Sequence, residues 1–250
     1  MLMDENKLSS PFYARTEMLL GKEGVKRLVG ARVAIFGIGG VGGHTVEALC
    51  RAGVESFLLI DGDRVSESNL NRQIIATKDT VGMYKTEAAR ARILSINPSA
   101  SVQVSNIFFT PEDEVKIDLS GFDYVVDAID SVAAKVTLIS MAKAASVPII
   151  SAMGAGNKLD PTAFRVADIS KTEICPLARA VRTALRKRGI THTKVVYSTE
   201  LPENTDTTSE QKADGKRAPA SVSFVPSVMG LIIAGEVIKD IAGKNSKTSV

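Results

Sequence analysis

The 250-residue chain has few of the residues on which several classes of protein depend. It contains only two cysteines, Cys50 and Cys175, which excludes a disulfide framework and any zinc site built from four cysteines. No apolar run approaches the roughly 20 residues of a membrane-spanning helix, and the first residues lack the apolar core of a signal peptide. We therefore expect a cytoplasmic protein that does not enter a membrane.

A large excess of charge of either sign is also missing, because the formal net charge is +3. A balance this small does not by itself indicate a nucleic-acid-binding protein. The chain is otherwise ordinary for a globular protein, with 44% hydrophobic and 24% charged residues. We expect a single domain over residues 1–250.

The most informative motif is Gly-Ile-Gly-Gly-Val-Gly at residues 37–42, directly after the apolar run 33–36. This order predicts a buried strand, a glycine turn and a helix that begins at about residue 41. Backbone N–H groups of such a turn bind phosphate together with the positive end of the helix dipole. The turn therefore indicates a nucleotide site, for which NAD is the usual ligand, and its candidate binding residues are Gly37, Gly39, Gly40 and Gly42.

Strand and helix patterns alternate along the chain up to Gly156. This β-α alternation predicts a Rossmann-like, doubly wound, mostly parallel sheet with helices on both faces. Strands are predicted at 33–36, 56–60, 102–104, 124–127 and 147–152, and helices at 8–30, 41–53, 82–96 and 132–145, with a short acidic helix opened by Pro111.

The pattern changes after Gly156, where antiparallel strands are predicted to extend the sheet. Residues 202–219 are polar and indicate a mobile loop, and the tail 243–250 is predicted to be disordered. We divide the domain into a nucleotide-binding part, 8–156, and a substrate and dimerisation part, 157–242. The later strands are predicted at 163–169, 194–198 and 221–225, and the later helices at 176–188 and 226–241.

Charged residues after the second and fourth strands favour ATP over NAD. Asp61 ends the second strand, where an acid binds ribose hydroxyls. An enzyme that splits ATP needs cations against the charge on the leaving pyrophosphate, and Arg72 and Lys85 supply them. Asp130 follows the fourth strand, at the sheet edge where a carboxylate can hold Mg²⁺ directly or through water.

Together these motifs resemble the ubiquitin-activating-enzyme-like family of adenylating enzymes, which includes bacterial activators of sulfur-carrier proteins. The resemblance implies that Asp61 binds the ribose, that Asn69, Arg72 and Lys85 lie near the phosphates, and that Asp130 holds magnesium. Two further residues of the 61–73 segment are candidates for nucleotide binding with an open alternative: Asp63 could instead brace the loop, and Gln73 could shape the turn.

Arg15, within Phe-Tyr-Ala-Arg-Thr-Glu at 12–17, matches an arginine that members of this family insert into the ATP site of the partner subunit. The resemblance therefore implies a homodimer with shared sites, in which Arg15 is catalytic. From the residues alone, the ordinary interpretation of Arg15 is a solvated charge on a helix.

Within this family, the chain lacks the two zinc-binding CxxC pairs of the sulfur-carrier activators. It resembles instead the tRNA threonylcarbamoyladenosine dehydratase branch. The implied substrate is the threonylcarbamoyl group on an adenosine beside the tRNA anticodon. Its carboxylate attacks the α-phosphate of ATP, and the carbamoyl group then closes on the acyl-adenylate to leave a cyclic oxazolone and AMP. The matching segments are 15–17, 127–131, 151–156, 160–161, 168–172 and 176–179.

A tRNA substrate should leave an electrostatic signal, and residues 174–199 contain no Asp or Glu. Positions 179, 182 and 186 share one face of the predicted helix. A local positive stripe neutralises phosphates even when the net charge is small; the alternative is an ordinary solvated helix face. The candidate tRNA-binding residues are Arg179, Arg182, Arg186, Lys187 and Arg188.

Three alternative functions stay open at this point. The chain could adenylate the C-terminus of a ubiquitin-like sulfur carrier, for which Cys175 would be the thiol near a helix N-terminus. It could be a nucleotide-binding scaffold that docks sulfur-transfer proteins without turnover. An NAD-dependent oxidoreductase has the least support, because an enzyme that leaves its pyrophosphate intact does not need Arg72 and Lys85.

Overall fold

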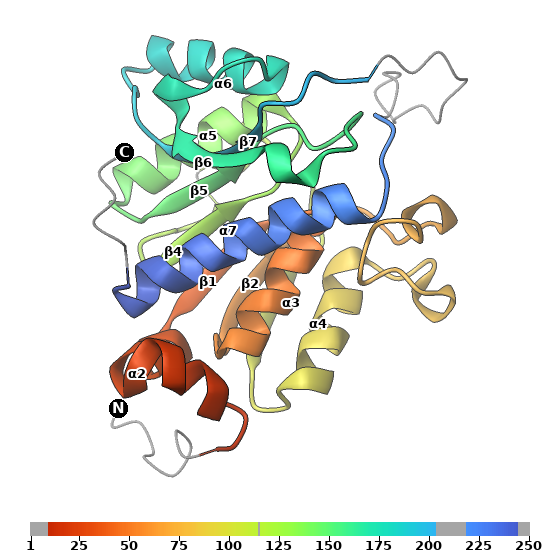
Figure 1. Ribbon diagram of the computed structural model, residues 1–250, viewed down its shortest axis with the longest axis vertical. Coiled ribbons are helices and arrows are strands. Elements are labelled where there is room, and N and C mark those ends of the chain that lie inside the picture. Colours follow the sequence, from red (N-terminus) through yellow and green to blue (C-terminus); the bar gives the residue numbers. More distant parts are fainter. Residues whose placement is uncertain (1–9, 115, 204–218, 245–250) are drawn as a thin grey trace.

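The computed structural model describes residues 10–114, 116–203 and 219–244. They form one seven-stranded sheet with helices on both faces, in the strand order β3-β2-β1-β4-β5-β7-β6 (Figure 1). All neighbouring strands are parallel except β6 and β7, which confirms the predicted fold class. The strands are β1 (Arg32–Phe36), β2 (Ser56–Ile60), β3 (Ser101–Ser105), β4 (Tyr124–Asp127), β5 (Ile149–Ala152), β6 (Phe164–Asp168) and β7 (Lys194–Ser198).

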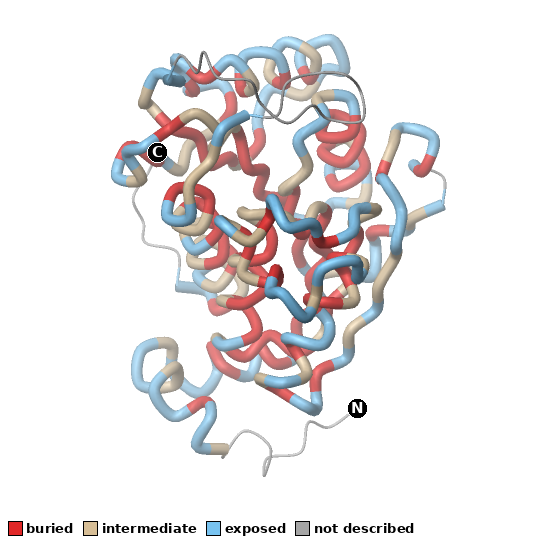
Figure 2. The backbone as a smooth tube through the Cα atoms, turned by 90° about the vertical axis from the view of Figure 1, so that its right-hand side faces the viewer, coloured by how far each residue is buried: buried red, intermediate tan, exposed pale blue. Residues whose placement is uncertain are grey.

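The helices form two layers, one on each face of the sheet. One core cluster joins the sheet to α2, α3, α4 and α7, and the other joins it to α5 and α6. Figure 2 shows the buried stretches running through the middle of the molecule between these layers. The helices are α2 (Ala14–Gly30), α3 (Gly42–Ala52), α4 (Lys85–Ile96), α5 (Val132–Ala144), α6 (Pro176–Lys187) and α7 (Phe224–Ala242).

Short 3₁₀ turns lie in the connections between the main elements, and two of them flank the carboxyl edge of the sheet. The turn η1 (Glu67–Asn69) shapes the long loop after β2, and η3 (Pro111–Asp113) follows β3. Pro111 opens η3, as predicted for the short acidic helix, because a first-turn residue needs no N–H partner. The other 3₁₀ turns are η2 (Lys78–Thr80), η4 (Pro161–Ala163) and η5 (Ile169–Lys171).

Three predicted elements differ from the structure. The strand predicted at 221–225 is wrong, because α7 already begins at Phe224; Pro226 fits its first turn, where N–H groups have no helical partner. The helix predicted from residue 82 begins at Lys85, since Gly82 has φ +91°. The leading helix is interrupted at Gly21 (φ 75°, ψ 163°).

Parts of the predicted loop 202–219 and tail 243–250 lie outside the described residues, as do residues 1–9. Among the helices that are described, none is long and apolar enough to span a membrane. The division of the domain at residue 156 stays a prediction, although β7 pairs directly with β5 and so joins both parts in one sheet.

Candidate nucleotide site at the carboxyl edge of the sheet

The glycine turn between β1 and α3 has no room for side chains at two of its positions. Gly37 has φ +89°, and a Cβ there would lie 2.6 Å from the carbonyl oxygen of Ala128. A Cβ on Gly42 would lie 1.8 Å from the carbonyl oxygen of Gly37. Gly40 is less restricted, since its Cβ would meet the ring of Pro226 at 3.2 Å. The turn therefore holds its backbone N–H groups close to the start of α3, the geometry that binds phosphate.

Asp61 connects the end of β2 to this turn. Its Oδ2 accepts a hydrogen bond from the backbone N–H of Ile38 at 2.6 Å, and its Oδ1 accepts one from Asp63 N–H at 2.8 Å. Burial raises the pKa of Asp61, against the opposing effects of the Lys85 charge and these two N–H donors. The carboxylate lies where a ribose would meet the glycine turn.

Lys85 points back from the first residue of α4 toward the same loop. Its Nζ lies 2.6 Å from Oδ2 of Asp63, and its side chain is 8% exposed while that of Asp63 is 51% exposed. The Lys85 N–H also donates to the Asp63 carbonyl at 3.0 Å. Asp63 therefore braces the loop and positions the lysine, and its role as a nucleotide ligand stays a prediction.

The loop after β2 is held by its own polar groups. Asn69 is buried, and its Oδ1 accepts from the Ser66 N–H at 3.2 Å. Arg72 is partly exposed, and its Nη1 donates to the Ser68 carbonyl at 2.8 Å and to Asn71 Oδ1 at 2.9 Å. These contacts keep Arg72 at the surface of the loop, while Asn69 fixes the loop from inside.

Gln73 carries the clearest signal of a missing ligand. Its side chain is buried at 6% exposure, and its Oε1 has no hydrogen-bond partner among the described residues. The space at Gly39 faces this side chain, with Gln73 Nε2 3.9 Å from a Cβ placed on that glycine. A buried acceptor left unpaired costs about 1–3 kcal/mol, so a donor group that reached Gln73 Oε1 would be favoured there.

Asp127 and Lys135 form a buried ion pair below the crevice that the sequence reasoning did not find. Lys135 Nζ lies 3.0 Å from Asp127 Oδ1, and both side chains are fully buried. Asp127 Oδ2 accepts from Ser151 Oγ at 2.5 Å, and Oδ1 accepts from the Ile129 N–H at 3.1 Å. The pair joins β4, β5 and α5. Its sequence signal was a lysine flanked by apolar residues in the first turns of a helix.

Asp130 lies three residues beyond Asp127, exposed between β4 and the Ser131 N-cap of α5. It is thus at the same edge of the sheet as the glycine turn, because β1 and β4 are parallel neighbours. No group of three or more His, Cys, Asp or Glu side chains suited to a metal occurs among the described residues. A magnesium ion would therefore depend on Asp130 and on oxygen atoms of the nucleotide itself.

Phe108 is a second residue that the sequence reasoning missed. Its side chain is 66% exposed in the connection after β3, and its ring lies against Gly62, where a Cβ would come within 2.7 Å of the ring. An exposed aromatic ring next to Asp61 offers a stacking surface at the ribose end of the crevice. The only sequence signal was the pair of phenylalanines at 108–109.

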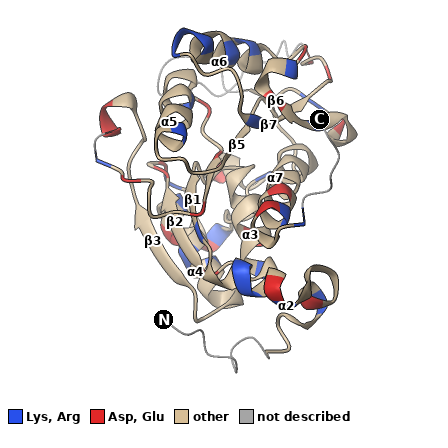
Figure 3. Ribbon diagram, turned by 90° about the vertical axis from the view of Figure 1, so that its left-hand side faces the viewer, with Lys and Arg blue, Asp and Glu red and all other residues tan. Residues whose placement is uncertain are grey.

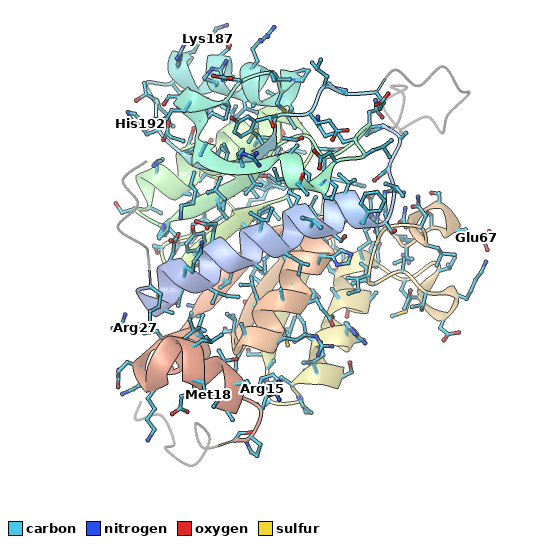
Figure 4. The ribbon with its side chains drawn as sticks, in the orientation of Figure 1. Arg15, Met18, Arg27, Glu67, Lys187 and His192 are labelled. Carbon is cyan, nitrogen blue, oxygen red and sulfur yellow. The ribbon has the colours of Figure 1, made fainter. Side chains whose placement is uncertain are left out.

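Arg15 lies at the opposite edge of the sheet from the glycine turn. The preceding Tyr13 packs against Gly53, which ends α3, and donates its hydroxyl to Glu55 at 2.6 Å just before β2. Figure 4 shows Arg15 and Met18 at the end of the molecule distant from Glu67. The structure therefore does not bring Arg15 to the crevice of its own chain.

Four of the five predicted tRNA-binding cations are exposed on or just after α6, at the end of the molecule seen at the top of Figure 3. Arg182 differs, because it is half-buried and donates from Nη1 to the carbonyl oxygen of Thr172 at 2.8 Å. Arg182 thus fastens η5 to α6. The exposed four are Arg179, Arg186, Lys187 and Arg188.

Both cysteines are buried, Cys50 within α3 and Cys175 at the N-cap of α6. Cys175 is 3% exposed, and its Sγ lies near Gly154. A thiol that accepts a carrier protein must be reachable, so this burial favours a packing role for Cys175.

The sequence and the structure of the chain are similar to those of known ATP-binding proteins. The ThiF family model matches residues 13–250. The chain is 42% identical over 240 residues to the tRNA threonylcarbamoyladenosine dehydratase of Bacillus subtilis (92% of this chain, 94% of the relative). It is 34% identical to the protein of the same name from Escherichia coli (94% and 95%). A solved structure of that E. coli dehydratase, TcdA, in complex with ATP matches with a TM-score of 0.86 and 30% identity over the whole of both chains. The chain therefore belongs to the ThiF family.

Proposed function

We propose that the chain is an ATP-dependent enzyme that dehydrates N6-threonylcarbamoyladenosine in tRNA by adenylating its carboxylate. One observation carries the proposal: the glycine turn, Asp61, Lys85 and the unpaired Gln73 Oε1 converge on one sheet edge. They do so in a chain 42% identical to a dehydratase of this name.

The residues present fit a nucleotide. The glycine turn supplies N–H donors for phosphates, Asp61 accepts from ribose hydroxyls, and Lys85 and Arg72 supply positive charge. Phe108 supplies an aromatic face for the base. The orphaned Gln73 oxygen supports this fit independently, because a bound hydroxyl or amine would complete it. Asp130 would hold a magnesium ion, which would draw charge from the phosphate oxygens.

The proposed reaction is the one that the resemblance implies, and these positions support it. An oxygen of the threonyl carboxylate attacks the α-phosphorus, so a new P–O bond forms as the bond to pyrophosphate breaks. Lys85 and Arg72 stabilise the negative charge that develops on the departing pyrophosphate. The carbamoyl oxygen then attacks the activated carbonyl carbon, the bond from that carbon to the AMP oxygen breaks, and one carbamoyl N–H proton is released; AMP carries away one former carboxylate oxygen. The net change in the nucleoside is the loss of one water.

Ring closure joins two groups of the same nucleoside, so positioning supplies much of its rate. The protein must therefore orient the carboxylate and keep water from the acyl-adenylate. The pair Asp127–Lys135 and Ser151 serve this by fixing the ends of β4 and β5 below the crevice.

We also propose a homodimer in which Arg15 completes the site of the partner subunit. Two observations support it: Arg15 cannot serve its own crevice, and the neighbouring side chains of Met18 and Leu19 are 85% and 82% exposed. Large apolar side chains this exposed on one helix indicate a surface that is covered by another chain.

The direct test incubates the purified protein with ATP, magnesium and tRNA carrying threonylcarbamoyladenosine. Mass spectrometry of the digested nucleosides should show the loss of one water, with one AMP formed per product. Release of phosphate and ADP without AMP, or no change in the nucleoside, would refute the proposal. The Cys175→Ser variant should turn over normally, whereas a sulfur-carrier activator that uses this thiol would lose activity.

A further inference from the structure

A groove lies between η3, α5 and α6, outside the nucleotide site. It has a volume of about 480 Å³, within the range of small-ligand sites. We call it the α5–α6 groove. It is lined by Pro111, Val132, Ala133, Val136, Ala184, Lys187 and Arg188.

The groove combines an apolar floor with a cationic rim. Its floor is built from small aliphatic side chains and Pro111, whereas Lys187 and Arg188 lie on the α6 side. Both cations are exposed, and Arg188 Nη1 reaches Ser140 Oγ on α5 at 3.3 Å. The two positive charges are thus held at one rim, and the apolar wall opposite them belongs to α5 and η3.

Acidic side chains close in sequence to the groove lie in and after η3 (Glu112, Asp113 and Glu114) and before α5 (Asp130). Glu112 is exposed, while Asp113 is buried and engaged with Lys116 Nζ at 2.9 Å and with Thr110. An anion in the groove is therefore favoured on the α6 side and disfavoured on the η3 side. This polarity suits a ligand with an apolar body and one negatively charged end.

Two walls of the groove begin close in sequence to residues that we place at the nucleotide crevice. Val132 opens α5 two residues after Asp130, and Pro111 lies three residues after Phe108. Because η3 follows β3 and α5 follows β4, both walls start from the carboxyl edge of the sheet, the edge that also carries the glycine turn.

We propose that the α5–α6 groove seats one unstacked base of the tRNA loop, next to the modified adenosine, with its phosphate on Lys187 and Arg188. The inference rests on the proposed function and deepens it by naming the RNA group that is bound. Sequence-specific RNA recognition works on bases splayed from loops and held on apolar surfaces. Residues 174–199 contain no acidic side chain, which favours an anionic ligand, and within the proposed function that ligand is the tRNA.

The test uses an anticodon stem–loop RNA that carries threonylcarbamoyladenosine, with 2-aminopurine placed at each loop position in turn. Binding is followed by fluorescence without ATP, so the result does not depend on turnover. We expect fluorescence to rise at one loop position, as a base leaves its stack. The Ala184→Leu variant, which fills the groove without a change of charge, should abolish that rise and weaken RNA binding roughly tenfold.

Matched variants keep the test interpretable. Ala144→Leu adds the same side chain at an exposed position of α5 outside the groove and should preserve the rise. Ala133→Leu fills the groove from the opposite wall and should repeat the effect of Ala184→Leu. Lys187→Ala and Arg188→Ala should each reduce the dependence of log affinity on log salt by about 0.7, whereas Ala184→Leu should leave that slope unchanged.

The proposal is overturned if no loop position changes, or if both leucine variants in the groove behave as Ala144→Leu does. A groove that instead binds an acidic peptide would give that second result. Loss of AMP formation with intact fluorescence would count against the proposed reaction alone and would leave the base seat standing.

Discussion

Both edges of the sheet carry charged groups that are paired with other protein groups, but the carboxyl edge also holds a buried polar atom that has no partner among the described residues. At the amino edge, Lys194 Nζ lies 2.8 Å from Asp240 and 3.1 Å from Glu236. The Tyr124 hydroxyl donates to the same Asp240 at 2.6 Å. We call these four residues the amino-edge cluster; every member has a partner within it, and it ties α7 to β4 and β7.

The carboxyl edge differs because its surface layer is left incomplete. Gln73 Oε1 lacks a partner among the described residues, and the ring of Phe108 is mostly exposed. Below this layer, Asp127 and Lys135 satisfy each other as fully as the amino-edge cluster does. We infer that charged groups with protein partners stabilise the fold. Gln73 and Phe108, which lack such partners or are exposed, are instead available to a ligand.

The largest effect on stability is expected from Lys135→Ala. The substitution leaves the Asp127 carboxylate buried without its counter-charge, which costs about 3–5 kcal/mol of the free energy of unfolding. Urea unfolding followed by circular dichroism measures it. Lys143→Ala on the exposed face of the same helix is the control and should change stability by less than about 0.5 kcal/mol. If Lys135→Ala changed the free energy of unfolding by an equally small amount, the Asp127–Lys135 pair would not be a major contributor to stability.

Lys85→Ala should have the largest effect on catalysis with little effect on stability. Loss of a cation that stabilises developing charge costs about 10²–10³-fold in kcat. Asp63 is half exposed, so water replaces its lost partner. The measurement is AMP formation with modified tRNA.

Lys78→Ala removes an exposed lysine from the same loop, where it pairs with Glu67 at 3.0 Å, and it should leave kcat unchanged. Equal losses in the two variants would mean that the loop responds to charge in general, and that Lys85 has no special place in the crevice.

Arg15→Ala tests the one residue at the amino edge that we assign to catalysis. Alone, it should lower kcat by about 10²-fold. Mixing it with inactive Lys85→Ala should restore activity, because a mixed dimer contains one site with both residues intact. Activity of the mixture equal to the mean of the two separate variants would contradict a shared site.

The smallest effect is expected from Lys194→Met in the amino-edge cluster. It should cost about 1–3 kcal/mol of stability and leave kcat unchanged. Burial opposes the charge of Lys194, but the carboxylates of Asp240 and Glu236 outweigh burial and raise its pKa. The stabilisation is therefore present in full below the ordinary lysine pKa and is lost as pH rises through the raised value.

Unfolding measured across the alkaline range checks this pH dependence. The stability difference between Lys194→Met and the unchanged protein should shrink at high pH. A difference that instead grew with pH would mean that the charged form of Lys194 is not the stabilising one.

The sequence predicted the sheet and the glycine turn because both depend on local signals. Apolar runs marked the buried strands, and glycines marked positions where the structure leaves no space for a Cβ. The strand predicted at 221–225 failed because a short apolar run next to a proline fits the first turn of a helix equally well. Nothing local distinguishes the two; packing of α7 on α3 decides between them.

Pairings across the fold were not predictable in the same way. Lys135 contacts Asp127 only when α5 packs on β4. Arg182 belongs to the predicted tRNA-binding residues, but its guanidinium donates to the carbonyl oxygen of Thr172 in the preceding turn. The unpaired oxygen of Gln73 is visible only after every neighbouring donor has been placed. The residue types therefore indicated the chemistry of the site. Only the three-dimensional contacts show which cations, such as Lys135 and Arg182, stabilise the fold.

We propose that the crevice activates a carboxylate by transfer of the adenylyl group. This transfer is tested most directly by labelling the threonyl carboxylate of the modified tRNA with oxygen-18 and analysing the nucleotide products by mass spectrometry. The account predicts that one labelled oxygen appears in AMP and none in pyrophosphate. Label in inorganic phosphate, or its complete absence from AMP while the nucleoside still loses water, would contradict it.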